Sequence, residues 1–218
     1  MHTIKRPAAA LAAVLLAAVA LTGCGGDDGK DKASDDSSSS APASEDPTDE
    51  PSEEPSTTDF GAPAKGDRVK GAGYTYRVPA SWTGITKKAA QVDRTIDSAA
   101  GEKQFPDGFQ DTVIVSFDKA EAGTGLDELE ASVPDQVKKI VKKLEILPAV
   151  TIDEVAAIHY RGTVGKAAGT SAYVLDQYVA IDEAGKITVI SFSFSPGLAR
   201  PAQQKLVNSV LASWKWSA

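Results

Sequence analysis

Side chains that could act as nucleophiles, general bases or metal ligands are scarce, because the 218 residues include one Cys and two His. His159 alternates with Ile158 and Tyr160 in an apolar stretch, with no metal-ligand spacing around it. A histidine in this setting is more often packed than catalytic. The sequence also lacks a Gly-x-Ser-x-Gly nucleophile elbow. We therefore expect no catalytic, cofactor-binding or metal-binding residues, and a protein that is not an enzyme.

The stretch Gly162-Thr-Val-Gly-Lys166 has a composition similar to that of a phosphate-binding loop. That loop needs a Gly five residues before its Gly-Lys pair and a Ser or Thr after it. Tyr160 and Ala167 occupy these two positions. We interpret the stretch as a Gly-rich turn.

The acidic residues Asp127, Glu128 and Glu130 could suggest a pair of catalytic carboxylates. They fall in the first turn of an expected helix, where negative charge complements the helix dipole. We therefore interpret them as helix-stabilising residues.

Four lysines form the densest basic group: Lys138, Lys139, Lys142 and Lys143. On a helical wheel they lie opposite Val137, Ile140, Val141 and Leu144. This arrangement predicts the solvated outer face of an amphipathic helix. Contact with anionic lipid or a wall polymer is the alternative.

Three tryptophans, Trp82, Trp214 and Trp216, have the size and polarity of packing or contact residues. We expect them to pack in the core and at its edge. Trp216, if it reaches the surface beside the last helix, is instead a candidate contact residue.

The amino terminus has the layout of an export signal. Lys5 and Arg6 precede an apolar stretch from Ala8 to Leu21, which is too short to span a bilayer but suits a signal peptide. The stretch ends in Leu21-Thr-Gly-Cys24, which resembles the bacterial lipobox. The resemblance implies cleavage before Cys24 and lipidation of its thiol. We expect a lipoprotein signal peptide over residues 1–23, with an ordinary signal peptide as the alternative.

Charge is distributed unevenly along the chain, whose net charge is -7. Residues 25–62 hold twelve acidic residues against two lysines and are rich in Ser, Pro and Gly, so we expect a disordered acidic tether after Cys24 that ends near residue 63. Residues 63–218 hold 19 basic and 18 acidic residues. Neither part has the basic excess typical of nucleic-acid binding, and we expect no such partner. A single Cys likewise excludes a disulfide scaffold.

Residues 64–218 show the patterns of a folded domain. Alternation predicts strands at 74–78 and at 92–96, and further strands are expected at 151–152 and at 157–164. The stretches 112–117 and 187–194 are apolar on both faces, which is typical of strands covered by helices on both sides. Residues 173–181 pair with the latter through the loop 182–185, which ends in a Gly.

Two amphipathic helices complete the domain. The first is predicted from Thr124, as N-cap, to Leu144, and Pro134 inside it predicts either a kink or two consecutive helices. The second begins at Pro201 and carries Leu206, Val207, Val210, Leu211 and Trp214 on one stripe. We predict an α+β fold: a mostly antiparallel sheet of about seven strands flanked by helices in a three-layer sandwich.

Two segments suggest a family: Tyr74-Thr-Tyr-Arg-Val-Pro-Ala-Ser-Trp82 and Asn208-Ser-Val-Leu-Ala-Ser-Trp-Lys-Trp216. With the order of elements, they resemble the PsbP-like and Mog-type fold over residues 68–216, as in LpqN-like lipoproteins of actinobacteria. The chain departs from that pattern at Asp153-Glu-Val155, where such domains often have a Gly-containing turn. The resemblance implies a binding or accessory module without a shared catalytic residue set.

Together these patterns predict a lipoprotein held by Cys24 on the extracytoplasmic face of the cell membrane. We expect it to act as a non-enzymatic binding or accessory module that docks on a protein or polymer of the envelope. The alternative is a carrier that holds a lipid or small hydrophobic ligand between sheet and helix. A filled core favours docking, and a large apolar cavity favours carriage.

Overall fold

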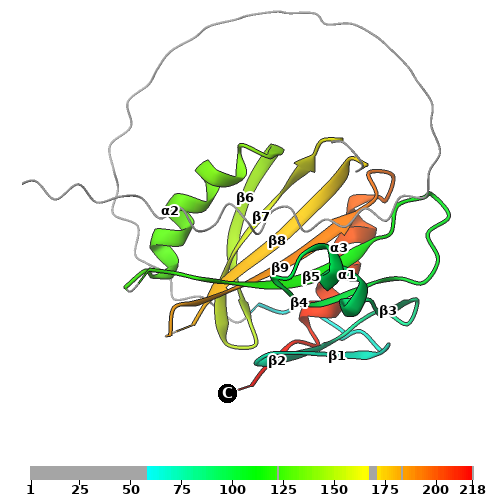
Figure 1. The fold of residues 1–218 in the computed structure, drawn as a ribbon, viewed down its shortest axis with the longest axis horizontal. Helices are drawn as coiled ribbons and strands as arrows, with labels where there is room; N and C mark the ends of the chain where they lie inside the picture. The colour runs from blue at the N-terminus through cyan, green and yellow to red at the C-terminus, as the bar shows by residue number, and fades with distance from the viewer. Residues whose placement is uncertain (1–57, 122, 167–170, 183, 218) are drawn as a thin grey trace, which may run out of the picture.

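The computed structural model describes residues 58–121, 123–166, 171–182 and 184–217. The predicted signal peptide, Cys24 and residues 25–57 of the predicted tether lie outside this part. The described residues form two antiparallel sheets and three helices (Figure 1). The predicted α+β class with a seven-stranded antiparallel sheet is therefore confirmed.

The large sheet has the strand order β3-β4-β5-β9-β8-β7-β6, and the small sheet has the order β1-β2-β10. The large sheet comprises β3 (Trp82–Gly84), β4 (Ile96–Glu102), β5 (Thr112–Lys119), β6 (Val141–Ile152), β7 (Val155–Val164), β8 (Tyr173–Ile181) and β9 (Lys186–Phe194). The small sheet comprises β1 (Arg68–Gly71), β2 (Tyr74–Arg77) and β10 (Lys215–Trp216). The helices are α1 (Thr86–Val92), α2 (Leu126–Val137) and α3 (Arg200–Leu211).

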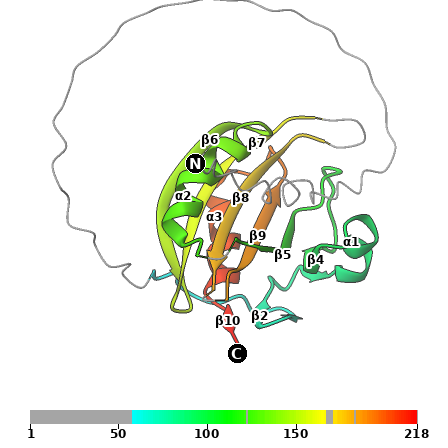
Figure 2. The same ribbon diagram turned by 60° about the vertical axis from the view of Figure 1, so that its left-hand side comes forward.

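The large sheet is the middle layer because its central strands bury side chains on both faces. On β9, Ile190 and Phe192 pack in the same core cluster as Val207 of α3. Val189, which precedes Ile190, packs with Leu129 of α2 in a second cluster. Alternate residues of one strand thus face different helices, as the pleat requires. Figure 2 shows α2 and α3 on opposite sides of the sheet.

The predicted hairpin between 173–181 and 187–194 is confirmed as β8 and β9, which pair from Val174↔Phe194 to Ile181↔Ile187. Its loop ends at Gly185, whose φ of 76° lies in the left-handed region that favours glycine. The predicted last helix is confirmed as α3, which has Pro201 in its first turn.

The predicted first helix is wrong beyond Val137 and at its cap. α2 begins after Gly125, without a side-chain cap from Thr124, and it contains Pro134. Residues 138–140 form a turn, and β6 starts at Val141. The apolar residues from Val141 onward have helical spacing, but they also suit a half-buried edge strand, and their pairing with β7 makes this segment a strand. Lys142 and Lys143 therefore lie on an edge strand rather than on a helix face.

Two other local predictions are wrong. The segment 92–96 is not a strand: α1 runs through Val92, and the Asp93 carboxylate accepts a hydrogen bond from the Thr95 amide in a turn before β4. Gly162 is not in a turn but inside β7. A Cβ at Gly162 would clash with Cγ1 of Val141, so glycine allows β6 to approach closely.

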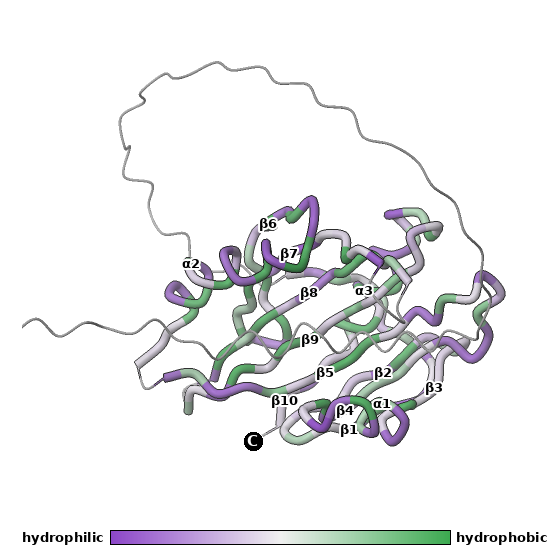
Figure 3. The backbone as a smooth tube through the Cα atoms, turned by 45° about the horizontal axis from the view of Figure 1, so that its top comes forward, coloured by the Kyte–Doolittle hydropathy of each residue, from purple (hydrophilic) through white to green (hydrophobic). Residues whose placement is uncertain are grey.

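The small sheet was not predicted separately from the large one. It packs on the α3 face, where the rings of Tyr74 and Tyr76 stack on buried Trp214 at 4.7 and 5.0 Å between centroids. Figure 3 shows hydrophilic residues mainly along the loops and the outer ends of the elements. Within the described ranges, no helix is long and apolar enough to cross a membrane.

Candidate functional site

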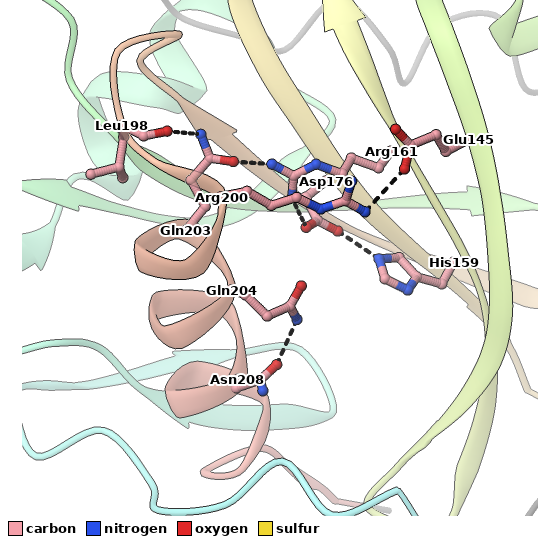
Figure 4. Close-up of polar contacts among 9 residues, drawn as sticks. All are labelled: Glu145, His159, Arg161, Asp176, Leu198, Arg200, Gln203, Gln204 and Asn208. Carbon is pink, nitrogen blue, oxygen red and sulfur yellow. Dashed lines mark hydrogen bonds and ion pairs between the residues drawn. The ribbon is translucent and has the colours of Figure 1, made fainter.

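His159 lies in a buried polar network between the large sheet and α3 (Figure 4). Its Nε2 is 2.7 Å from Oδ1 of Asp176, and Nη1 of Arg161 donates to Oδ2 of the same carboxylate at 2.8 Å. The His159 ring stacks on Tyr178 with centroids 4.2 Å apart. Burial raises the pKa of Tyr178, which keeps its phenol protonated. His159 is thus a packed side chain, as predicted.

The network continues onto α3 and ends there. The second Arg161 Nη donates to Gln203 of α3, whose own amide donates to the Leu198 carbonyl at 2.6 Å. At the surface, Arg200 pairs with Glu145 of β6 at 3.0 Å. Each of these side chains is paired with a neighbour, so the network joins α3 to the sheet. No sequence pattern predicted it, because Arg161, Asp176 and Gln203 come from β7, β8 and α3, and only the fold brings them together.

A second buried acid, Asp111, stands just before β5. Oδ1 of Asp111 accepts the Ser195 amide hydrogen at 2.7 Å. Burial raises the pKa of this carboxyl to about 7, and the nearby charges of Glu102 and Asp107 add to the effect. Within the described part of the chain, no group of three or more His, Cys, Asp or Glu could hold a metal ion.

Trp216 is half-buried, and the turn between β6 and β7 holds it in place. Its indole N–H donates to the Ile152 carbonyl at 2.7 Å, and its backbone N–H donates to Asp153 at 2.9 Å. The Asp153 carboxylate also pairs with Lys215. Asp153 and Glu154 have φ values of 46° and 72°, a conformation that costs residues other than glycine free energy.

Lys186 joins the small sheet to the large sheet on the other side of Trp216. Its ammonium donates to the Ala72 carbonyl at 2.8 Å and lies 3.6 Å from the centroid of the Phe117 ring. A cation over an aromatic face adds a favourable electrostatic contact. The two sheets are therefore linked both at Asp153 and at Lys186.

Between these two links lies a surface hollow of about 300 Å³, which we call the inter-sheet hollow. It is lined by Gly73, Val155, Ala180, Ile181, Asp182, Lys186, Thr188, Trp216 and Ser217. Most of its wall is apolar, and its charged groups are one ammonium and one carboxylate. Such a hollow can accept a small apolar group, and its two charges can orient polar groups that are attached to it.

The other predicted residues lie elsewhere. Trp82 and Trp214 are buried in the core, as predicted, and Asp127 and Glu128 stand in the first turn of α2. The four lysines surround the junction of α2 and β6. Cys24 lies outside the described residues, so its lipidation remains a prediction.

Comparisons with known proteins give similar folds at low identity. No sequence family and no curated protein match the chain. A Bacteroides thetaiotaomicron crystal structure is 12% identical over 66% of this chain, with a TM-score of 0.43, and the match covers 45% of that protein. The solution structure of cyanobacterial PsbP from Synechocystis is 17% identical over 69% of this chain and 91% of its own, with a TM-score of 0.46.

A variant of the protein Mog1 is 13% identical over 69% of this chain and 95% of its own, with a TM-score of 0.44. PsbP and Mog1 are thus among the solved structures to which this chain is similar. These identities and scores transfer no function, and membership of the LpqN-like lipoproteins remains a prediction.

Proposed function

We propose that the protein is a membrane-anchored extracytoplasmic lipoprotein that acts as a non-enzymatic binding or accessory module of the cell envelope. Leu21-Thr-Gly-Cys24 after an apolar stretch supports the anchor. The folded part presents the inter-sheet hollow to an apolar side chain of an envelope protein. LpqN-like lipoproteins of actinobacteria remain the family that the sequence resembles.

The observation that carries the docking proposal is the construction of the hollow. Trp216 donates two hydrogen bonds to the β6–β7 turn, and Lys186 is held by a carbonyl and an aromatic ring. Walls held in this way lose little conformational entropy when a partner binds. Aromatic residues such as Trp216 are also enriched in the energetically dominant parts of protein interfaces.

A carrier of a lipid or small hydrophobic ligand is the second candidate. Its support is the mostly apolar wall of the same hollow. A volume of about 300 Å³ is at the lower end of small-molecule sites, which span roughly 300 to 1,000 Å³. A lipid chain would therefore occupy the hollow only in part.

Affinity capture of the tagged protein from detergent-solubilised membranes tests the docking proposal. Ser217→Arg places a long side chain at the exposed edge of the hollow and keeps the hydrogen bond from the Ser217 amide to the Gly73 carbonyl. Ser81→Arg is the matched control, at an exposed serine in the turn before β3, outside the hollow. We expect a stoichiometric protein partner that survives moderate salt, is lost with Ser217→Arg and is kept with Ser81→Arg. Capture of a lipid alone would instead favour the carrier.

Cell fractionation of Cys24→Ser tests the anchor separately. Without its thiol the chain cannot be lipidated, so it should move to soluble or uncleaved fractions. Unchanged membrane association with normal processing would contradict the lipoprotein assignment and would leave the docking proposal standing.

A further inference from the structure

The junction of α2 and β6 gathers positive charge. Lys138 and Lys139 lie in the turn after α2, and Lys142 and Lys143 follow at the start of β6; all four are exposed. Gly165, just after β7, packs beside the end of the Lys142 side chain. We call these four lysines the lysine corner.

Little negative charge balances the lysine corner within the described residues. Lys138 pairs with Asp135 at 3.3 Å, and the nearby Glu145 pairs with Arg200 of α3. None of the ion pairs among the described residues includes Lys139, Lys142 or Lys143. An anionic segment could therefore pair with Lys139, Lys142 and Lys143 without displacing an ion pair of the described residues.

The described chain starts at the opposite end of the same strand. The Thr151 amide near the end of β6 donates to the Thr58 hydroxyl at 3.0 Å. Phe60 packs against the main core cluster. The segment that precedes Thr58 therefore joins the domain beside β6.

The length of that segment selects which of its acidic residues can reach the lysine corner. Eight residues of β6 separate Thr151 from Lys143, about 26 Å at 3.3 Å per residue. Glu50 is eight residues before Thr58, and the extended chain spans up to about 28 Å over that length. Glu54 is four residues before Thr58 and has a span of about 14 Å.

We propose that the acidic segment 45–50 of this chain docks on the lysine corner. Four acidic residues in six positions, Glu45, Asp46, Asp49 and Glu50, match four lysines in six positions. Pro47 and the following Pro51 lack the amide hydrogens that regular strand pairing requires. The contact is therefore made by charged side chains at the surface and is sensitive to salt. An anionic partner of the lysine corner has to displace this segment.

Zero-length carbodiimide crosslinking of the full, membrane-extracted protein in detergent tests the proposal. The reagent joins a carboxylate to a lysine amine with loss of water, and mass spectrometry of the peptides locates each link. We expect links from residues 45–50 to Lys142 or Lys143. Their yield should fall about tenfold or more between low salt and 0.5 M NaCl, since screening weakens exposed charge pairs. Glu54 should form such links at a much lower yield because of its shorter span.

Matched variants separate docking from random collision. Lys142→Gln with Lys143→Gln should abolish the links, whereas Lys87→Gln with Lys88→Gln, at an exposed lysine pair of α1, should not change them. Equal linking of residues 45–50 to Lys87 and Lys142 would overturn the proposal, as would a yield that does not respond to salt.

A vesicle measurement distinguishes a membrane as the occupant. If the segment covers the lysine corner, neutralising it with E45Q, D46N, D49N and E50Q should strengthen salt-sensitive binding to phosphatidylglycerol vesicles several-fold. If these substitutions leave binding unchanged while Lys142→Gln with Lys143→Gln weakens it, the corner faces the membrane and the proposal is wrong.

Discussion

Arg161→Met should destabilise the protein far more than Arg200→Met, although each arginine pairs with one carboxylate (Figure 4). The side chain of Asp176 is 0% exposed and that of Arg161 is 8% exposed. Without Arg161 the buried carboxylate keeps the His159 contact and loses its positive partner. Breaking such a pair costs about 3 to 5 kcal/mol. The Arg200 and Glu145 side chains are 58% and 50% exposed, and pairs of this kind contribute up to about 1 kcal/mol.

Urea unfolding at pH 7, followed by tryptophan fluorescence, measures both variants. Replacing the whole pair with Arg161→Met and Asp176→Leu should destabilise less than Arg161→Met alone, because no unpaired charge is then buried. The reasoning is refuted if Arg161→Met and Arg200→Met change the free energy of unfolding by amounts within about 1 kcal/mol of each other.

Three further predictions concern the buried acid, the strained turn and the close approach of β6. Because burial raises the pKa of Asp111 to about 7, its folded form keeps a proton that the unfolded chain releases near pH 4. The contribution of Asp111 to the free energy of unfolding should fall by about 1 to 3 kcal/mol as the pH rises from 5 to 8. Asp111→Asn should therefore flatten the plot of urea midpoint against pH over this range. Equal slopes for the variant and the parent protein would refute the prediction. Glu154→Gly should leave the free energy of unfolding unchanged or raise it by up to about 1 kcal/mol, since glycine freely adopts the φ of 72° that Glu154 has. Asp153→Gly should lower the free energy of unfolding by about 1 to 2 kcal/mol, because the contacts of Asp153 with Lys215 and Trp216 are lost. Equal urea midpoints for the two variants would contradict this prediction. Gly162→Ala should lower the free energy of unfolding by about 1 to 3 kcal/mol, because the added Cβ clashes with the Val141 side chain. A thermal unfolding midpoint equal to that of the parent protein would count against the register of β6 and β7.

Apolar patterning was enough to predict the central part of the fold. The strands at 112–117 and 187–194 are apolar on both faces, and the structure places them side by side as β5 and β9 between helices. The Pro201 start and the apolar stripe likewise predicted α3. These features depend on period and burial, which the sequence carries directly.

The errors and omissions depend on contacts between distant segments. Residues 141–144 fit a helical stripe and an edge strand equally well, and pairing with β7 decides between them. The inter-sheet hollow needs β10 beside β2 and Lys186 beside Ala72, which lie more than 100 residues apart. No local pattern predicts such a hollow. Trp216 was named as a candidate contact residue, but its neighbours in the hollow could not be named.

Site-specific photo-crosslinking at residue 217 tests most directly whether the inter-sheet hollow binds an envelope protein. A benzophenone amino acid replaces Ser217 in the full chain in intact cells, and the same probe in place of Ser81 is the control. The account predicts one discrete protein adduct from residue 217, absent from residue 81, whose crosslinked peptide contributes an apolar side chain. Lipid adducts alone, or the same protein adduct from both positions, would contradict it.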